Sequence, residues 1–477
     1  MMKIFKPHPL MIFYFVKPTL IALILPAIQA ILQYLTHNNV NGVRGFSLSI
    51  TGAIFGIAVL RWRSYKLICN QHEQVITIEY GFFFKRITKI NITKLSSVQT
   101  VQNPVDFIFG AVTIKINTEA GIHTRADFKF KLGTNKSREL ALLLYGEEKA
   151  QPIKYSAIKV AVLVATASSA FTGMLVAVPI LNRAGNLLGI GVGDMLLDGI
   201  NSISAKIESY FPPILNTISL IILFFFLVSF TYSFFKYVNF RLFLEKDKLG
   251  VWMGAIVKTR TVFRKSAINN IKVEQTIIMK TLKRYALKVS VGGYGNAKGE
   301  SEVIIPLGTK NEIRNKLKKH LPFFVRSGTQ ISPKRNYLTQ SRFLFLPALY
   351  FIGVTALSIW SVFYFEYLTR FVVFLNFVFC TIIILYAYIG LFEYHYSQIS
   401  FGDNFFARSS KGLRTLEINC PKENVGEIKI TLFPPDRWYK TCRVRVLVHG
   451  ERADNIRVRH IDYETVKAEI YKCFNIE

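Results

Sequence analysis

The chain has 477 residues, a formal net charge of +30 and a mean hydropathy of +0.29, and 51% of its residues are hydrophobic. This composition argues against an ordinary soluble globular protein and indicates a membrane protein with several domains. A strongly basic chain could also bind nucleic acid. Here, however, the positive charge is concentrated in three segments between apolar runs, which favours membrane topology as its origin.

Six apolar runs with almost no charged residues follow one another along the chain. They cover residues 9–35, 46–62, 158–181, 213–235, 343–365 and 371–391. At a rise of about 1.5 Å per residue, roughly 20 residues cross a hydrocarbon layer about 30 Å thick, so all six runs are long enough, the second only marginally. The runs predict six spans. The first is too long for a signal peptide and is expected to be a retained anchor.

The spans form three pairs, and a soluble-looking segment follows each pair. The predicted layout is a transmembrane pair in 1–62, a domain in 63–150, a second pair in 155–236 with an external connector in 182–212, a domain in 237–325, a third pair in 341–392 and a domain in 393–477. Of the 60 Lys and Arg residues, 15, 21 and 14 fall in the three soluble segments and their flanks. Because positive residues stay on the cytoplasmic side, we expect these domains and both termini in the cytoplasm.

The three soluble segments share a sequence repeat. A shift of 173 residues places Gly81 on Gly254 and Gln102 on Gln275, and a shift of 330 relates the first segment to the third more loosely. In each copy, strand-like alternation precedes a helix-like pattern, which predicts a small β domain that ends in an amphipathic helix. The positions that define the repeat are Gly81, Val98, Gln102, Gly110, Gly121, Gly254, Ile271 and Gln275.

The residues from Gly81 to Gly121 carry a family resemblance. Gly81, the sequence SSVQTVQ that ends at Gln102, Gly110 and the turn TEAG that ends at Gly121 resemble the bacterial PH-like domain of the YdbS/YdbT membrane-flanked family. Three such copies with six spans resemble its larger, YdbT-like members over nearly the whole chain. The resemblance implies a polytopic α-helical membrane protein of six spans with three cytoplasmic PH-like β-barrel or sandwich domains, each ending in a helix.

The same resemblance implies a location and partners. It suggests the bacterial inner membrane, a smaller YdbS-like membrane protein as partner, and a role in cell-envelope maintenance or in resistance to membrane-active compounds. The copies also differ, since Lys283 and Lys440 replace the glycine that aligns with Gly110. We therefore expect no strict requirement for a positive φ at this position.

Basic residues gather on the predicted hairpin of the first two copies and near Gly110's counterpart in the second. PH-like domains that bind phosphoinositides use basic residues in an equivalent hairpin, and Lys and Arg donate hydrogen bonds to phosphate oxygens. The simpler alternative is a solvated strand face with the positive bias of a cytoplasmic domain. The candidate headgroup ligands are Lys85, Arg86, Lys89, Lys258, Arg260, Arg264, Lys265, Lys280, Lys283 and Arg284.

Catalytic patterns are absent from the sequence. The eight histidines lack metal-site spacing, and there is no nucleophile elbow or phosphate-binding loop, so we expect no enzymatic activity, cofactor or metal. Within the apolar runs only Lys17 and Lys159 are charged, apart from Arg61 at the end of the second run, which gives little support for a polar transport path. The predicted function is a scaffold that binds membrane lipids and a partner protein and can form homo-oligomers, without nucleic acid. The alternative is a membrane transporter or exporter component.

Overall fold

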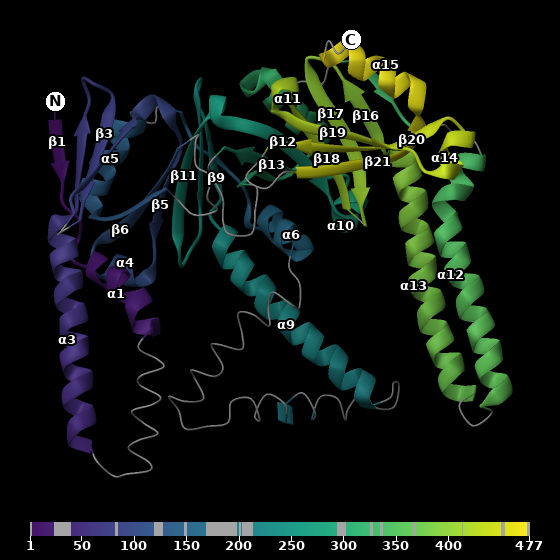
Figure 1. The fold of residues 1–477 in the computed structure, drawn as a ribbon, viewed down its shortest axis with the longest axis horizontal. Coiled ribbons are helices and arrows are strands. Elements are labelled where there is room, and N and C mark those ends of the chain that lie inside the picture. Colours follow the sequence, from purple (N-terminus) through teal and green to yellow (C-terminus); the bar gives the residue numbers. More distant parts are fainter. Residues whose placement is uncertain are drawn as a thin grey trace. The chain divides into compact units, whose positions relative to one another are not determined.

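The computed structural model consists mainly of helices and strands (Figure 1). It describes residues 2–22, 40–81, 84–118, 127–146, 150–167, 198–199, 202, 213–292, 302–324, 328–333, 337–365, 369–412, 414–449 and 454–474. Gly121 and most of the predicted connector 182–212 lie outside these residues. The chain divides into two compact units: the first contains residues 1–157, 169–267 and 292–298, and the second contains 158–168, 268–291 and 299–477.

The prediction of a six-span α-helical membrane protein is wrong. Within the described residues, three helical segments are long and apolar enough to cross a membrane, and four β-sheets form the framework. The three segments are Leu220–Tyr237, Thr339–Tyr364 and Phe379–Tyr396. The run 46–62 falls in α3 (Val40–Ser64), which is not among these three segments. The run 9–35 is described as helix only over α1 (Met11–Ala22).

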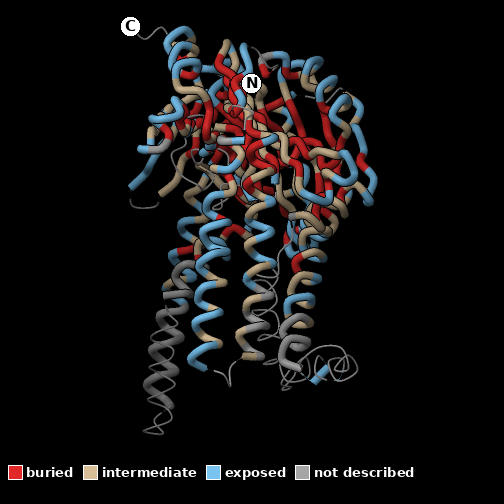
Figure 2. Tube along the Cα trace, turned by 90° about the vertical axis from the view of Figure 1, so that its right-hand side faces the viewer, coloured by how far each residue is buried: buried red, intermediate tan, exposed pale blue. Residues whose placement is uncertain are grey.

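The long helices contribute little to the buried core. The other apolar helices are α6 (Ala157–Ala167), α9 (Pro213–Tyr237), α12 (Tyr337–Tyr364) and α13 (Thr369–Tyr396). In Figure 2 the buried residues gather in the strand-rich parts, whereas the described lengths of the long helices are mostly intermediate or exposed. Only 6% of Leu220–Tyr237 is buried, although the segment is strongly apolar. Such a surface suits a lipid environment better than water.

Three sets of strands, each closed by a helix, repeat along the chain and support the predicted PH-like domains. The first set is β1 (Met2–Phe5), β2 (Lys66–Asn70), β3 (Val75–Tyr80), β4 (Arg86–Asn91), β5 (Leu95–Gln102), β6 (Ala111–Thr118), β7 (Phe128–Gly133) and α5 (Thr134–Tyr145). The second is β8 (Ile153–Lys154), β9 (Arg241–Leu244), β10 (Lys248–Met253), β11 (Lys258–Arg264), β12 (Ile268–Gln275), β13 (Tyr285–Val291), β14 (Glu302–Gly308) and α11 (Lys310–His320). The third is β15 (Thr329–Ile331), β16 (Gln398–Phe401), β17 (Asn404–Lys411), β18 (Arg414–Pro421), β19 (Val425–Thr431), β20 (Thr441–Val448), β21 (Asp454–Asp462) and α15 (Tyr463–Phe474).

The sheets cross the boundaries between the repeats. In the first unit the order β7-β6-β5-β11-β10-β9-β8 joins β5 of the first repeat to β11 of the second. In the second unit the order β14-β13-β12-β18-β17-β16-β15 joins β12 of the second repeat to β18 of the third. We call the β5–β11 pairing the first joint and the β12–β18 pairing the second joint. The remaining sheets are β1-β2-β3-β4 and β19-β20-β21.

Both joints have the same register. Val98 lies opposite Val262 in the first joint, and Ile271 lies opposite Asn419 in the second. Val98 and Ile271 are equivalent under the 173-residue shift. Val262 and Asn419 differ by 157, which is also the difference between the 330-residue and 173-residue shifts. The two joints therefore repeat one arrangement of strands.

A β-bulge recurs at the same place in all three repeats. It falls between Leu95 and Ser97, between Ile268 and Asn270, and between Val425 and Glu427. These positions are related by the shifts of 173 and 330 residues. The third copy, which the sequence relates only loosely to the first, thus follows the same backbone path, because a bulge fixes the local bend and twist of a strand.

The expectation that lysine removes the need for a positive φ is wrong. A short helix precedes this position in each repeat, namely α4 (Pro104–Ile108), α10 (Ile277–Thr281) and α14 (Pro434–Trp438). The φ angle is +63° at Gly110, +51° at Lys283 and +52° at Lys440. All three copies keep the left-handed turn, so two of them hold a lysine in a conformation that L residues rarely adopt.

The repeat glutamine secures the strand that follows this turn. Gln102 Nε2 donates to the carbonyl oxygen of Ala111 at 3.3 Å, and Gln275 Nε2 donates to that of Arg284 at 3.1 Å. Each acceptor is the residue directly after the left-handed position. The hydrogen bond explains why a glutamine recurs at this point of the repeat.

A buried ionic cluster connects α12 to the third repeat. Asp436 Oδ1 lies 3.5 Å from Arg342 Nη1 and 3.3 Å from His460 Nδ1, and Asp436 Oδ2 lies 3.4 Å from Arg443 Nε. Burial lowers the pKa of His460 to about 4; Asp436 opposes this shift, whereas Arg443 and two other nearby arginines add to it. His460 is therefore neutral at neutral pH, and the arginines balance Asp436.

We expect the left-handed turn to be measurable in the free energy of unfolding. Gly110→Ala should lower it by about 1 kcal/mol, because the added Cβ meets no atom within 4 Å and only backbone strain contributes. Lys440→Gly should leave it unchanged or raise it by up to about 1 kcal/mol, since relief of strain competes with the entropy of an unfolded glycine. Denaturant unfolding of the detergent-solubilised chain measures both changes. A stable Gly110→Ala variant together with a destabilised Lys440→Gly variant would contradict this account.

The buried His460 predicts a loss of stability in acid. Between pH values of about 6.5 and 4, the unfolded chain binds a proton at this imidazole that the native chain does not. The free energy of unfolding should then fall as the pH falls, by up to about 1.4 kcal/mol per pH unit. His460→Asn should flatten this dependence, and asparagine tolerates the φ of +58° at this position. Thermal unfolding midpoints at several pH values test the prediction, which fails if both proteins lose stability equally.

Candidate anion-binding groove at the first joint

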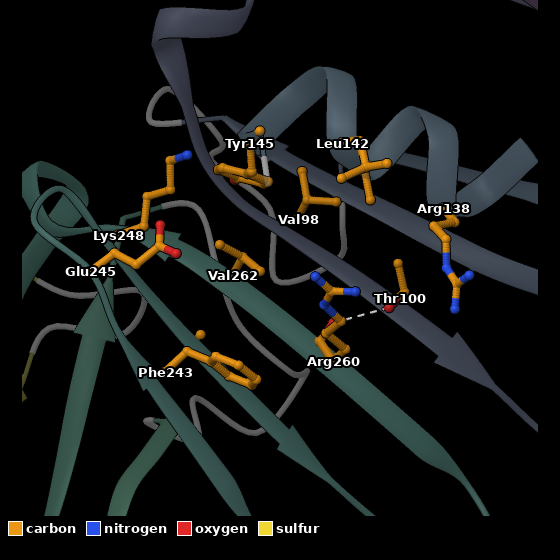
Figure 3. A pocket seen from close by; sticks show the side chains of 13 residues that line it. Val98, Thr100, Arg138, Leu142, Tyr145, Phe243, Glu245, Lys248, Arg260 and Val262 are labelled. Carbon is orange, nitrogen blue, oxygen red and sulfur yellow. Dashed lines mark hydrogen bonds between the residues drawn. The ribbon is translucent and has the colours of Figure 1, made fainter. Parts of the chain in front are cut away.

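A groove runs along the first joint, between α5 and strands β5, β9, β10 and β11. Its wider part has a volume of about 420 Å³ and its narrow part about 50 Å³. The two parts share Thr100, Arg138, Ala141 and Arg260. Figure 3 shows the narrow part, where Arg138 from α5 and Arg260 from β11 lie on either side of Thr100 from β5.

Strand pairing at the joint creates this groove from residues far apart in sequence. Thr100 lies opposite Arg260, and its Oγ1 donates to the Arg260 carbonyl oxygen at 3.4 Å. Beside it, Gln99 Nε2 donates to Thr261 Oγ1 at 3.3 Å. These bonds hold the floor of the groove, and α5 forms one wall through Arg138 and Ala141.

The wider part is strongly positive. Of the described residues that line it, four are basic and none is acidic. The four are Arg138, Arg241, Lys258 and Arg260. Arg260 Cζ lies 4.7 Å from the centre of the Trp252 ring, which holds its guanidinium over the groove. Four cations in one concave surface, with hydroxyls from Thr134 and Ser137 nearby, can bind the oxygens of a phosphate or carboxylate group.

The narrow part is mainly apolar. Val98, Leu142, Phe243 and Val262 line it, together with Tyr145 at the end of α5. The acidic Glu245 and the basic Lys248 also line this part. Burial raises the pKa of Tyr145, which keeps its hydroxyl protonated. The groove therefore changes from cationic to apolar along its length.

The cationic part lies next to the end of α9. The Gly254 N–H donates to the Val238 carbonyl oxygen at 2.7 Å, and the Ala255 N–H donates to that of Phe235 at 3.0 Å. Gly254 has a φ of +101°, and a Cβ there would lie 2.0 Å from the Val257 carbonyl oxygen, so only glycine fits. Gly254 and Arg241 both line the groove. An apolar helix thus ends a few residues from a set of cations.

The ten predicted headgroup ligands do not form one site. Lys258 and Arg260 line the groove, as described above. Arg264 instead donates from Nη1 to the Thr93 carbonyl oxygen at 2.9 Å. Burial lowers the pKa of Lys265, and Asp247 opposes that shift. These two residues of the predicted hairpin cluster therefore interact with other parts of the protein and do not line the groove.

The other predicted ligands lie on separate elements. Arg86 and Lys89 are exposed on β4, and Lys85 precedes this strand, 3.2 Å from Glu79. Lys280 lies in α10, and its Nζ is 3.6 Å from the centre of the Phe392 ring. Lys283 and Arg284 follow α10.

Sequence reasoning missed Arg138 and Arg241. On α5 Arg138 has only Lys136 as a basic neighbour, and Arg241 begins a short strand, so neither belongs to a dense basic cluster in the sequence. Their positions in the repeat were the only sequence feature that could have indicated them: Arg138 lies in the helix that ends the first repeat, and Arg241 follows an apolar run. The joint brings Arg138 to Lys258, whereas Arg241 lies near Lys258 because β9, β10 and β11 are adjacent in the sheet.

The second joint has an equivalent groove with different charges. Its volume is about 380 Å³, and its basic lining residues are Lys310, Arg314, Lys318 and Arg408. Arg408 Nη2 lies 2.6 Å from Glu417 Oε1, and these two residues stand where Trp252 and Arg260 stand in the first joint. The acidic residue neutralises part of this groove, whereas the described lining of the wider part at the first joint has no acidic residue, so that part is the better candidate for binding an anion.

No group of three or more His, Cys, Asp or Glu side chains in the described part of the chain could hold a metal ion. The absence of enzymatic activity and of a cofactor stays a prediction.

Comparison with protein families relates the chain to one of them. A model described as the bacterial PH domain matches residues 11–148 and 190–321, which is more than half of the chain. No curated protein and no solved structure matches it.

Proposed function

The chain belongs to the bacterial PH domain family, and we propose that it is a non-enzymatic membrane scaffold whose first joint binds the headgroups of anionic phospholipids. A bacterial PH domain suggests a module that binds protein or lipid. The observation that carries the proposal is the placement of four basic side chains beside the end of the apolar helix α9, in the wider part of the groove, where the described lining residues include no acidic one.

The end of α9 has the residues expected at a membrane surface. Leu220–Tyr237 is apolar enough to lie in hydrocarbon. Lys236 is in the last turn, and its Nζ lies 5.1 Å from the centre of the Tyr237 ring. Lysine and tyrosine favour the headgroup layer. With α9 in a bilayer, Arg241 and the groove would lie at the level of the lipid phosphates, where each basic residue contributes about 1 kcal/mol toward an anionic surface.

The connection between helices and sheets supports a common side for the PH-like domains. Short strands before the apolar segments pair with the strands that follow them: β1 with β2, β8 with β9 and β15 with β16. Each helical excursion therefore leaves and returns at adjacent antiparallel strands. Together with the basic residues of these domains, this arrangement fits both termini and all three domains on the cytoplasmic side of a bacterial inner membrane.

The finer parts of the proposal concern identity and partners. The repeat motifs make the chain similar to YdbT-like proteins, and a smaller YdbS-like membrane protein is the proposed partner. A scaffold that holds such a partner against anionic lipid would act in envelope maintenance or in resistance to membrane-active compounds.

Reversal of charge in the groove should weaken lipid binding. For Arg138→Glu with Arg241→Glu in the full chain, we expect about 10- to 100-fold weaker binding of dioctanoyl phosphatidylglycerol, because hydrogen bonds to charged groups are lost. Titration calorimetry in a mild, uncharged detergent measures the affinity. The fluorescence of Trp252, beside Arg260, gives a second readout. Dioctanoyl phosphatidylcholine and glycerol phosphate distinguish the anionic lipid from a neutral lipid and from a free phosphate.

Lys136→Glu is the matched control. Lys136 is exposed on the same helix as Arg138 but does not line the groove. This variant should bind phosphatidylglycerol within about twofold of the parent at physiological salt, because only screened, long-range attraction changes. Equal weakening by the control and the groove variants, or equal binding of the two lipids, would refute headgroup binding in the groove.

A further inference from the structure

Two strand edges, those of β4 and β19, have no paired strand among the described residues, although the equivalent edges in the other repeats are paired at the joints. β4 is the last strand of the sheet β1-β2-β3-β4, yet its counterparts β11 and β18 each pair with another repeat. β19 is the first strand of the sheet β19-β20-β21, yet its counterparts β5 and β12 are also paired across repeats. The two joints thus use two kinds of edge, and one edge of each kind has no paired strand among the described residues.

Burial follows the same division. Thr261 and Val262 on β11 are buried, at 0% and 9% exposure, whereas their counterparts on β4 are more open: Thr88 is half-buried and Lys89 is exposed. Ser97 on β5 is completely buried, and its counterpart Glu427 on β19 is exposed. At these positions, side chains that a neighbouring repeat covers at the joints are more open to solvent on β4 and β19, whereas Ile90 on β4 is buried within its own repeat.

We propose that β4 of one molecule pairs with β19 of a second copy and forms a third joint. Its register follows from the repeat shifts of 173 and 330 residues. When the residue pairs of the first joint or those of the second joint are shifted onto β4 and β19, both give the same residue pairs. Thr88 then lies opposite Lys429, Ile87 opposite Ile430, and Ile90 opposite Glu427. In this register Ile428 and Lys89 face one another, as the equivalent residues Val98 and Val262 do in the first joint.

The composition of the two edges favours this occupant. In the proposed register no two residues of like charge face one another: Arg86 faces Thr431 and Lys89 faces Ile428. Glu427 adds a negative charge close to the cations of β4. Edge strands with unpaired N–H and C=O groups readily accept another strand, and every copy of the chain supplies both required edges.

The proposed contact is heterologous, because β4 and β19 are different surfaces. Each added copy leaves one β4 and one β19 unpaired, so association continues until a ring closes. We therefore expect species larger than a dimer at high protein concentration. This inference does not depend on lipid binding in the groove.

Disulfide trapping tests the register in the full chain. Two differently tagged forms, one with Thr88→Cys and one with Lys429→Cys, are mixed in mild detergent and oxidised. Residues opposite one another on antiparallel strands have Cβ atoms about 5 Å apart, close enough for a disulfide. The expected product carries both tags.

The matched control mixes Thr88→Cys with Arg445→Cys. Arg445 is exposed and lies opposite Lys429 on the adjacent strand β20, so it would be one strand, about 4.8 Å, further from β4. The control should give about tenfold less mixed product, because the two Cβ atoms are then too far apart. Equal yields from both mixtures, a disulfide product from Thr88→Cys alone, or no mixed product at any concentration would overturn the proposal.

A charge exchange provides a second test that needs no cysteine. Thr88→Lys places two lysines opposite one another and should shift the molecular mass, measured by light scattering in detergent, toward the monomer. Adding Lys429→Glu to the same chain should restore the larger species, since opposite charges then face each other. A parent chain that stays monomeric but captures a different PH-like protein would refute pairing between copies.

Discussion

Backbone pairing between repeats is the constraint on which the rest of the structure depends. A strand edge presents unpaired N–H and C=O groups, and the protein satisfies four such edges by joining β5 to β11 and β12 to β18. The groove, its cations and the shared register all follow from these two joints. Arg138 and Lys258 are 120 positions apart in the chain and line one surface only because their repeats share a sheet.

The two joints show how one backbone arrangement supports different chemistry. Arg260 stacks on Trp252 in the first joint, whereas Glu417 forms an ion pair with Arg408 at the equivalent positions of the second. The strand path is constrained by pairing and by the common bulge, but side chains on the groove face are not. A duplicated element can therefore gain or lose affinity for an anion without any change of fold.

Local patterns predicted much of the fold, and long-range pairing limited the rest. Strand alternation identified β3, β6 and β20, and the 173-residue shift correctly aligned β5 with β12. Alternation does not reveal which strand pairs with which edge, so the joints and the position of Arg138 next to Lys258 were not predictable. The hydropathy runs predicted six spans, whereas the described residues contain three segments long and apolar enough to cross a membrane. Lysine at positions 283 and 440 concealed a left-handed turn that glycine would have indicated.

The sharing of sheets also determines how the molecule can be divided. The second repeat, if excised at its sequence boundaries, would expose the edges of both β11 and β12, which are paired at the two joints. Such a fragment would be prone to aggregate, because apolar edges recruit other strands. The segment that was duplicated in the sequence is thus smaller than the segment that can fold alone. Shortening the chain by one whole repeat would be tolerated only where the new neighbours reproduce the lost joint.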